Sequence, residues 1–276
     1  MSYDRDGFVK WMQEDELSDA TIRSYLKSAD CYFQNREDIT KAGIIEYKRD
    51  LIASGAKTNT VNLRLCGIRA YIRFAGDDVS VRQLKSQKAS SIDNVISNAD
   101  YNRLLEGLMA DGNMEGYYRV KFLAGTGARV SELIRLKKKH LDAGRAELYS
   151  KGKVRTIYIP ASLISESAEY FSDLEPEDYL FQPYVSRYGH RRTDKPIRRE
   201  SVGDDMRRWA AKYDIPKEVM HPHSLRHRFA INFMKNNSDL TLLADVMGHS
   251  GVNTTMIYTR MSMDEQKDAV DKAVNW

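Results

Sequence analysis

The stretch AELYSKGKVRTIYIP, residues 146–160, interrupts a sequence whose apolar residues otherwise recur at helical spacing. Two sets of side chains alternate along its second half, Val154, Thr156 and Tyr158 in one set and Arg155, Ile157 and Ile159 in the other. This alternation is the period of a half-buried β-strand. Because a Lys-Gly-Lys turn separates it from a second β-rich run, the stretch predicts a small antiparallel hairpin.

Helical patterns flank this hairpin on both sides. They cover residues 101–109 and a run ending at Ala124, resume in VSELIRL after the turn GTGAR at residues 125–129, and dominate from about residue 200 onward. Residues 5–75 form a separate helical pattern of four segments. We expect Thr58 or Asn59 to be the N-cap of the fourth helix. The sequence therefore predicts a mainly α fold of the α+β class with one small antiparallel sheet.

A linker pattern separates the two helical parts. LKSQKASSIDNVIS, residues 84–97, is rich in Ser and Lys and short of large apolar residues until its end. A chain of 276 residues is also longer than one ordinary domain. We therefore expect an N-terminal helical domain at residues 1–90 and a second domain at residues 91–276.

Composition excludes some classes of protein but does not select one. The net charge is only +4, from 43 basic and 39 acidic residues, so the total charge does not indicate a nucleic-acid partner. Cys31 and Cys66 lie far apart without a metal-binding spacing, and we interpret them as reduced core residues. No apolar run approaches the roughly 18 residues of a membrane span. We expect a soluble, cytoplasmic protein.

HPHSLRHRFA, residues 221–230, carries the first candidate site. Pro222 suits a helix start, and Leu225 and Phe229 belong to a stripe that faces a core. His223 and Arg226 lie off that stripe and share a face, so they can meet one small anion near the helix N-terminus. So short a pattern also arises by chance, and in isolation a surface pair near a cap is the favoured explanation.

Three further segments contain residues that could have either a catalytic or a purely structural role. Arg129 follows a glycine-containing turn, with Glu132 one helical turn later, which is also the spacing of a solvated ion pair. Lys151 and Lys153 of the hairpin turn can be edge charges that prevent aggregation. His249 follows Gly248, which suits a helix end, and can simply decorate that cap.

Tyr258 lies nine residues after His249 in the segment MGHSGVNTTMIYTR, residues 247–260. A lone tyrosine is more often packed than reactive. At pH 7 a phenol is ionised to about one part in a thousand, so its use as a nucleophile costs about 4 kcal/mol unless neighbours offset it. Two arginines and a base would be suitable neighbours.

Taken in order, these residues resemble the catalytic signature of the tyrosine recombinases. The segments TGARVSELIRL, SKGKVRTIYIP, HPHSLRHRFA and LLADVMGHSGVNTTMIYTR are similar to that family's motif blocks and follow the family's order. The compact Xer-like and phage or archaeal integrases are most similar. The helical N-terminal part also resembles the family's SAM-like core-binding domain. The resemblance implies the DNA breaking-rejoining fold for the second domain.

The resemblance also implies a role for each matched residue. Arg129 and Arg226 would clamp the non-bridging oxygens of the scissile phosphate, where a planar, permanently charged donor suits the transition state. His249 would hydrogen-bond the same phosphate. Tyr258 would attack the phosphorus and form a 3′-phosphotyrosine, with His223 as its general base.

Lys151 would protonate the leaving 5′-oxygen, and Glu132 would orient site residues. The family commonly shows Gly-Lys-Gly in the hairpin, whereas Ser150 precedes Lys151 here and Lys153 follows, so either lysine remains a candidate for the general acid. The phosphotyrosine ester conserves the energy of the broken bond. Rejoining therefore needs no ATP, and the resemblance implies no cofactor and no metal.

Two basic segments are candidate DNA contacts. SRYGHRRTDKPIRR, residues 186–199, holds six Lys or Arg against one Asp, and we select Arg187, Arg191, Arg192, Arg198 and Arg199 from it. The fourth N-terminal helix contributes Arg64, Arg69 and Arg73. A charge run is equally typical of a solvated loop. Together with the motifs, two basic faces joined by a linker suggest a clamp around duplex DNA.

Assembly and function leave alternatives open. The tail after Tyr258, residues 261–276, has a short apolar stripe that can pack on its own domain or on a neighbouring protomer. We expect a largely monomeric protein that becomes a homotetramer on paired DNA sites. The rival functions are a non-catalytic DNA-binding protein, which would have no use for the Tyr258 phenol, and a type IB topoisomerase-like nickase, which would act without tetramers.

Overall fold

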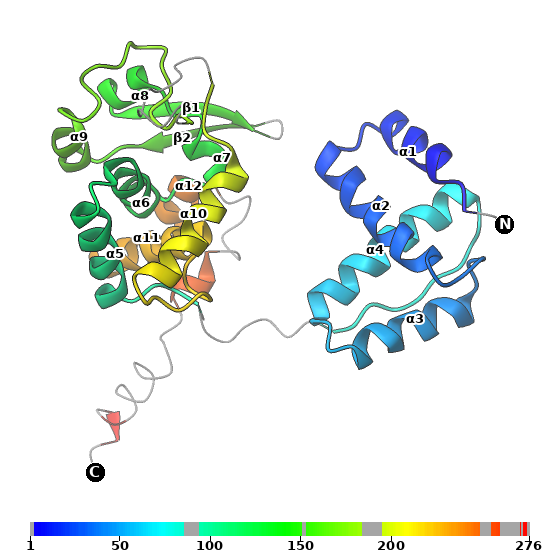
Figure 1. Cartoon of the computed structure of the whole chain (residues 1–276). Helices are drawn as coiled ribbons and strands as arrows, with labels where there is room; N and C mark the ends of the chain where they lie inside the picture. The colour runs from blue at the N-terminus through cyan, green and yellow to red at the C-terminus, as the bar shows by residue number, and fades with distance from the viewer. Residues whose placement is uncertain are drawn as a thin grey trace. The chain divides into compact units, whose positions relative to one another are not determined.

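The computed structural model describes residues 3–85, 94–150, 153–183, 195–248 and 255–259, together with residues 271, 273 and 274; the side chains of Ser150, Lys153 and Thr259 are outside this description. The chain divides into two compact units, Met1–Lys88 and Ala89–Trp276 (Figure 1). The domain boundary expected near residue 90 lies outside the described residues.

The N-terminal unit consists of four helices, α1 (Arg5–Glu14), α2 (Asp19–Phe33), α3 (Lys41–Ala53) and α4 (Thr58–Ala75). Its core includes Phe8, Met12 and Tyr32, all fully buried. The expected cap of α4 is wrong: Thr58 is already helical, and Lys57 is the N-cap residue, without a side-chain capping bond. Both cysteines are free thiols and only half-buried, so they are not core residues.

The second unit contains the helices α5 (Asn98–Ala110), α6 (Met114–Thr126), α7 (Val130–Leu133), α8 (Lys138–Asp142), α9 (Ala161–Ser167), α10 (Arg199–Lys212), α11 (Pro222–Asn236) and α12 (Leu240–Met247), and a short 3₁₀ helix, η2 (Met256–Thr259). In this unit α11 packs most extensively against α6. This helical content, with one two-stranded sheet among the described residues, confirms the mainly α prediction.

The predicted hairpin is present as β1 (Arg145–Ser150) and β2 (Lys153–Tyr158), paired antiparallel with Arg145 opposite Tyr158. Ile157 and Arg155 are buried, whereas Val154 and Tyr158 are more than half exposed, which confirms the alternation along β2. β1 lies against α8 and β2 against α12 (Figure 1). An inward-facing residue of β2 therefore reaches the end of α12.

A tight turn joins α6 to α7. Gly127 ends α6 in the left-handed region, with φ of 60°, where glycine is favoured. A Cβ at Gly127 would overlap the ring of Phe229 on α11, so this position also requires the absence of a side chain. The Thr126 hydroxyl donates to the Phe122 carbonyl at 2.6 Å and accepts from the Ala128 N–H at 3.2 Å, which stabilises the turn.

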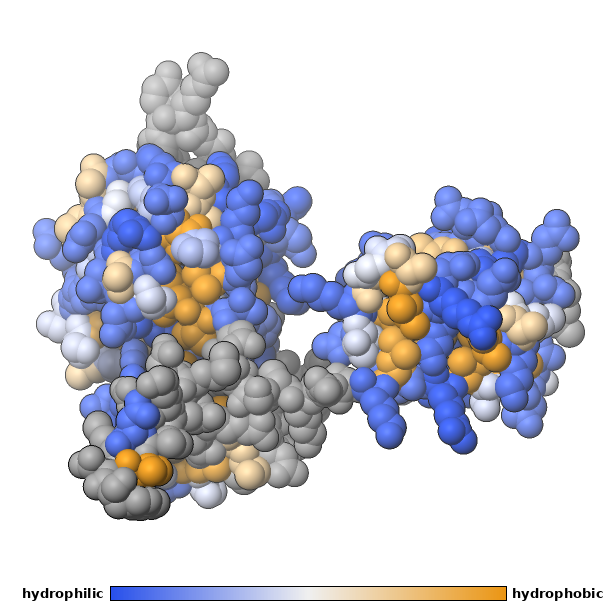
Figure 2. All heavy atoms as spheres, turned by 90° about the horizontal axis from the view of Figure 1, so that it is seen from below, coloured by the Kyte–Doolittle hydropathy of each residue, from blue (hydrophilic) through white to orange (hydrophobic). Residues whose placement is uncertain are grey.

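Hydrophilic side chains cover most of the surface of each unit that is seen in Figure 2, with smaller apolar areas between them. None of the described helices combines the length and the apolar character needed to cross a bilayer.

Candidate active site

Arg129 is placed by the α6–α7 turn at the N-cap position of α7. Its Nη1 donates to Glu132 Oε1 at 2.8 Å, and its Nη2 donates to the carbonyl oxygen of Gly248 at 3.0 Å. The Arg129 N–H also donates to Glu132 Oε2 at 2.7 Å. The side chain keeps 37% of its surface exposed, so a ligand can reach this guanidinium.

Arg226 lies on α11 and is buried, with 4% of its surface exposed. Its guanidinium donates to the carbonyl oxygens of Gly127 and Met247. Burial, followed by the charges of Arg155 and Arg129, lowers the pKa of Arg226 to about 9. The side chain therefore stays cationic at neutral pH, and the cost of its burial is offset by hydrogen bonds to main-chain oxygens.

A third arginine, Arg155, belongs to the same cluster. It reaches in from β2 with 8% of its surface exposed, pairs with the Glu132 carboxylate and donates to the Val246 carbonyl at 2.8 Å. The sequence analysis did not select it. The sequence does contain a signal for Arg155, because it is a charged residue at an inward-facing position of an alternating strand and a buried charge requires a partner.

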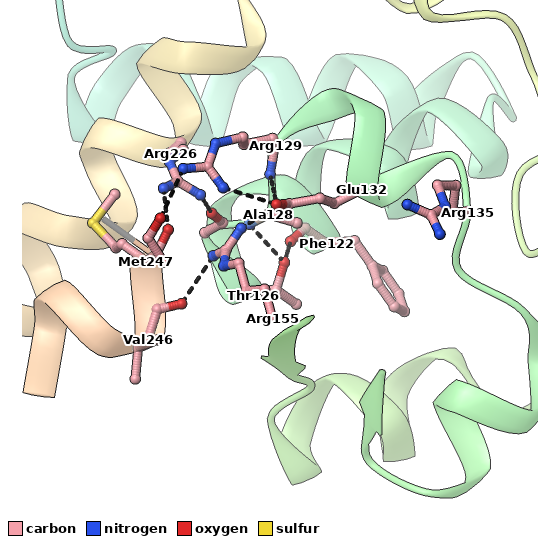
Figure 3. A network of polar contacts seen from close by, with 12 residues as sticks. Phe122, Thr126, Ala128, Arg129, Glu132, Arg135, Arg155, Arg226, Val246 and Met247 are labelled. Atoms are coloured by element: carbon pink, nitrogen blue, oxygen red, sulfur yellow. Dashed lines mark hydrogen bonds and ion pairs between the residues drawn. The ribbon is translucent and has the colours of Figure 1, made fainter. Parts of the chain in front are cut away.

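Glu132 joins two of these arginines through one carboxylate (Figure 3). Its side chain is 4% exposed. Burial alone raises the pKa of this carboxyl, but the hydrogen bond from the Arg129 N–H and the charge of Arg155 more than offset it and hold the pKa below its usual range. Glu132 is thus an ionised carboxylate that holds Arg129 and Arg155 together.

The last turn of α12 is the common acceptor of the cluster. Consecutive carbonyls of residues 246–248 each accept from a different arginine, in order Arg155, Arg226 and Arg129. Figure 3 shows the first two of these bonds. The final carbonyls of a helix have no partner within the helix and carry the negative end of its dipole, so guanidiniums stabilise them. The arginines therefore fix the end of α12, after which His249 follows.

Tyr258 is packed and also hydrogen-bonded to an imidazole. It is 8% exposed and belongs to an apolar cluster with Ala230, Leu243 and Met247. Its hydroxyl oxygen lies 2.7 Å from Nδ1 of His227 on α11. Burial raises the pKa of the Tyr258 phenol, and the charge of Arg226 partly offsets this.

His223, Arg226 and His227 share one face of α11 by their helical spacing. His223 is exposed, and partial desolvation of its ring together with the Arg226 charge lowers its pKa. The imidazole that contacts Tyr258 is His227, one helical turn farther along, which the sequence analysis did not select. Its position four residues after His223 was the available signal.

Several predicted site residues fall outside the described part of the chain. Lys151 and His249 lie there entirely, and Lys153 is described only as backbone of β2. Their roles stay predictions from the sequence.

The expected DNA contacts divide in the same way. Arg198 and Arg199 are exposed where α10 begins, whereas Arg187, Arg191 and Arg192 lie outside the described residues. On α4, Arg64 and Arg69 donate to the carbonyls of Lys27 and Val81, and Arg73 is exposed.

Comparison with known proteins identifies the family. The family model described as the phage integrase family matches residues 94–265, which include every residue of the arginine cluster and Tyr258. The chain belongs to the phage integrase family. This integrase is 26% identical to the tyrosine recombinase XerA of Pyrococcus furiosus over 271 residues, which cover 96% of this chain and 92% of that protein. It is 27% identical to the tyrosine recombinase XerD of Oceanobacillus iheyensis, covering 97% of each.

Solved structures share the fold of the integrase. A crystal structure of XerA recombinase matches with a TM-score of 0.52 at 24% identity, covering 99% of this chain and 98% of the other. A lambda integrase dimer bound to a core site matches with a TM-score of 0.72 at 16% identity, covering 92% of this chain and 75% of the other. By its family and relatives, the integrase is a tyrosine site-specific recombinase, an enzyme that breaks and rejoins DNA.

Proposed function

We propose that this recombinase cleaves duplex DNA through a 3′-phosphotyrosine formed by Tyr258. The observation that carries this is the position of the phenol. Its oxygen contacts the imidazole of His227 on α11, and the preceding residue of that helix is Arg226 of the arginine cluster. A hydrogen-bond acceptor on the phenol and cations nearby are the two conditions that make a tyrosine usable as a nucleophile.

Arg129 and Arg226 are proposed to hold the scissile phosphate. The carbonyls of Gly248 and Met247 that accept from them are weaker acceptors than a phosphate oxygen, because the phosphate carries a negative charge that attracts the guanidinium and the carbonyl is neutral. The fixed guanidiniums are thus ready to exchange carbonyls for phosphate. Charge that gathers on the equatorial oxygens in the transition state strengthens this contact.

The remaining roles follow the resemblance. Lys151 protonates the leaving 5′-oxygen, with Lys153 as the alternative, and His249 hydrogen-bonds the phosphate. Of the imidazoles on α11, the resemblance assigns the proton of the phenol to His223. No step of this scheme calls on a metal or cofactor.

The partner is double-stranded DNA. Transposon Tn1549 integrase and XerH recombinase, which share the fold, have been solved in complex with DNA. On this chain the exposed arginines of α4 and of the start of α10 would contact the phosphate backbone. We propose that the recombinase is largely monomeric alone, forms a homotetramer on paired sites, and is a cytoplasmic, nucleoid-associated protein.

The test is covalent trapping of the protein on nicked duplex DNA. Tyr258→Phe is expected to bind this DNA and to form no protein–DNA band on a denaturing gel. Tyr117→Phe is a matched control, because Tyr117 is 7% exposed and its hydroxyl donates to Glu166 Oε1 at 2.8 Å. It should keep the band. An undiminished band from Tyr258→Phe would remove this residue from the mechanism.

A further inference from the structure

We propose that His227, and not His223, accepts the proton of the Tyr258 phenol during DNA cleavage. The inference rests on the proposed function of Tyr258 as the nucleophile. It makes His227 a catalytic residue, because its ring contacts the reacting oxygen, and leaves His223 as a contact to the phosphate.

Geometry is the first support. Nδ1 of His227 and the Tyr258 hydroxyl oxygen are 2.7 Å apart, the distance of a short hydrogen bond. The two rings are tilted by 49° with centroids 5.6 Å apart, so they meet through these atoms and do not stack. His227 also directly follows Arg226, so the phosphate clamp and the proton acceptor sit on consecutive residues of α11.

The charges that act on His227 are those of His223, His221 and Arg226 on its own helix, and Tyr258 on η2 contacts its ring. The other elements packed against α11 are α12 and α6. α12 carries the exposed Asp239 and Asp245 at its two ends, and on α6 the side chain of Arg119 pairs with Glu115 and Asp205 and that of Lys121 with Glu166. Burial, followed by the neighbouring His223, His221 and Arg226, lowers the pKa of His227 to about 4. The imidazole is therefore neutral at pH 7.

The direction of the hydrogen bond is assigned from the protonation states. A neutral imidazole has one donor and one acceptor nitrogen. Burial raises the pKa of the Tyr258 phenol, so the phenol keeps its proton, and in the tautomer that we assign, with the ring proton on Nε2, it donates to Nδ1. A bound phosphate would add a negative charge beside Arg226, which favours the imidazolium and makes His227 a stronger base when substrate is present.

The proposed step is balanced. As the phenol oxygen bonds to phosphorus, its proton moves to Nδ1 of His227, and the bond from phosphorus to the 5′-oxygen breaks, with the proton for that oxygen coming from the hairpin lysine. In the rejoining step the 5′-hydroxyl attacks the phosphotyrosine and gives its proton back to the hairpin lysine, the bond from phosphorus to the phenol oxygen breaks, and the imidazolium returns its proton to that departing oxygen.

The experiment measures single-turnover cleavage of a duplex with a 5′-bridging phosphorothiolate, whose thiolate leaves without a proton. Rates are taken from pH 5.5 to 9.5 for the wild type, His227→Gln and the matched variant His223→Gln, with DNA binding and thermal melting measured beside them. We expect His227→Gln to lose about 100-fold in rate at pH 7 and to recover tenfold per pH unit, because solvent must then remove the proton. His223→Gln should be slower but keep the wild-type shape of the pH profile.

A second measurement separates chemistry from misfolding. Replacing Tyr258 by a difluorotyrosine, whose phenol is more acidic, should restore the rate of His227→Gln far more than it changes that of the wild type. A wild-type pH profile for His227→Gln, or the steep profile appearing in His223→Gln, would overturn the inference. A wild-type protein that forms no adduct through Tyr258 would instead overturn the proposed function, and the two failures are thereby distinguished.

Discussion

Replacing Glu132 by Gln should destabilise the second unit. The side chain is 4% exposed and pairs with both Arg129 and Arg155, of which Arg155 is itself only 8% exposed. Removing one partner of a buried ion pair costs about 3–5 kcal/mol, and because a glutamine oxygen can still accept one hydrogen bond we expect about 3 kcal/mol. For a unit of this size that is a fall of about 6–12 °C in melting temperature.

Scanning calorimetry on the full chain measures this. Glu177→Gln is the matched control, because Glu177 also accepts from two cations, Lys137 and Lys139 at 2.7 Å each, but is 66% exposed. Solvent screens such a pair, and its loss should scarcely change the melting temperature. The reasoning would be refuted if the two variants melted alike. Adding Arg155→Met to Glu132→Gln should recover part of the loss, since it removes the unpaired cation.

The effect of pH supplies an independent check. The pKa of Glu132 is held below its ordinary value of 4.5 in the folded protein, so its stabilisation is fully present above the unfolded pKa and disappears as the pH falls through the folded pKa. The gap in free energy of unfolding between wild type and Glu132→Gln should therefore be constant at neutral pH and narrow on acidification below 4.5. A gap that stayed constant to pH 3 would contradict the ionised state of this carboxyl.

Three further outcomes are expected. Arg129→Ala and Arg226→Ala should each slow cleavage by several orders of magnitude while keeping most DNA affinity, because many other phosphates are contacted; parallel losses in a gel-shift and a cleavage assay would make both anchoring residues. A 5′-bridging phosphorothiolate should rescue Lys151→Ala, whereas rescue of Lys153→Ala alone would transfer the general-acid role to Lys153. Deleting residues 263–276 should leave single-site affinity near normal and abolish pairing of sites in light scattering, and a fully active truncation would show that the tail is dispensable.

The sequence predicted those parts of the fold that depend on local periodicity. The helices, the hairpin and the side of β2 that faces inward all follow from spacings of two or three to four residues. The α4 cap was missed because the extended backbone of Lys57 starts the helix without a side-chain bond, and a search for capping side chains cannot find that arrangement.

The site could be predicted only in part. Arg129, Glu132 and Arg226 were selected from their motifs, and the structure brings them into one cluster. Arg155 and His227 were missed because their partners, Glu132 and Tyr258, are 23 and 31 residues away in the sequence and meet them only through tertiary packing. Each residue has a local signal in the sequence, but that signal does not name the partner, which depends on the tertiary fold.

Gly248, which follows the last turn of α12, is subject to two independent constraints. Its φ of 60° disfavours a side chain, and a Cβ there would also overlap the side chain of Arg155. A larger residue at 248 would displace Arg155, free Glu132 from one partner and shift the carbonyl that accepts from Arg129. The absence of a side chain at Gly248 thus lets Arg155 of β2, Glu132 and Arg129 keep their mutual distances. A substitution at Gly248 should therefore slow cleavage although this residue contacts none of the reacting groups.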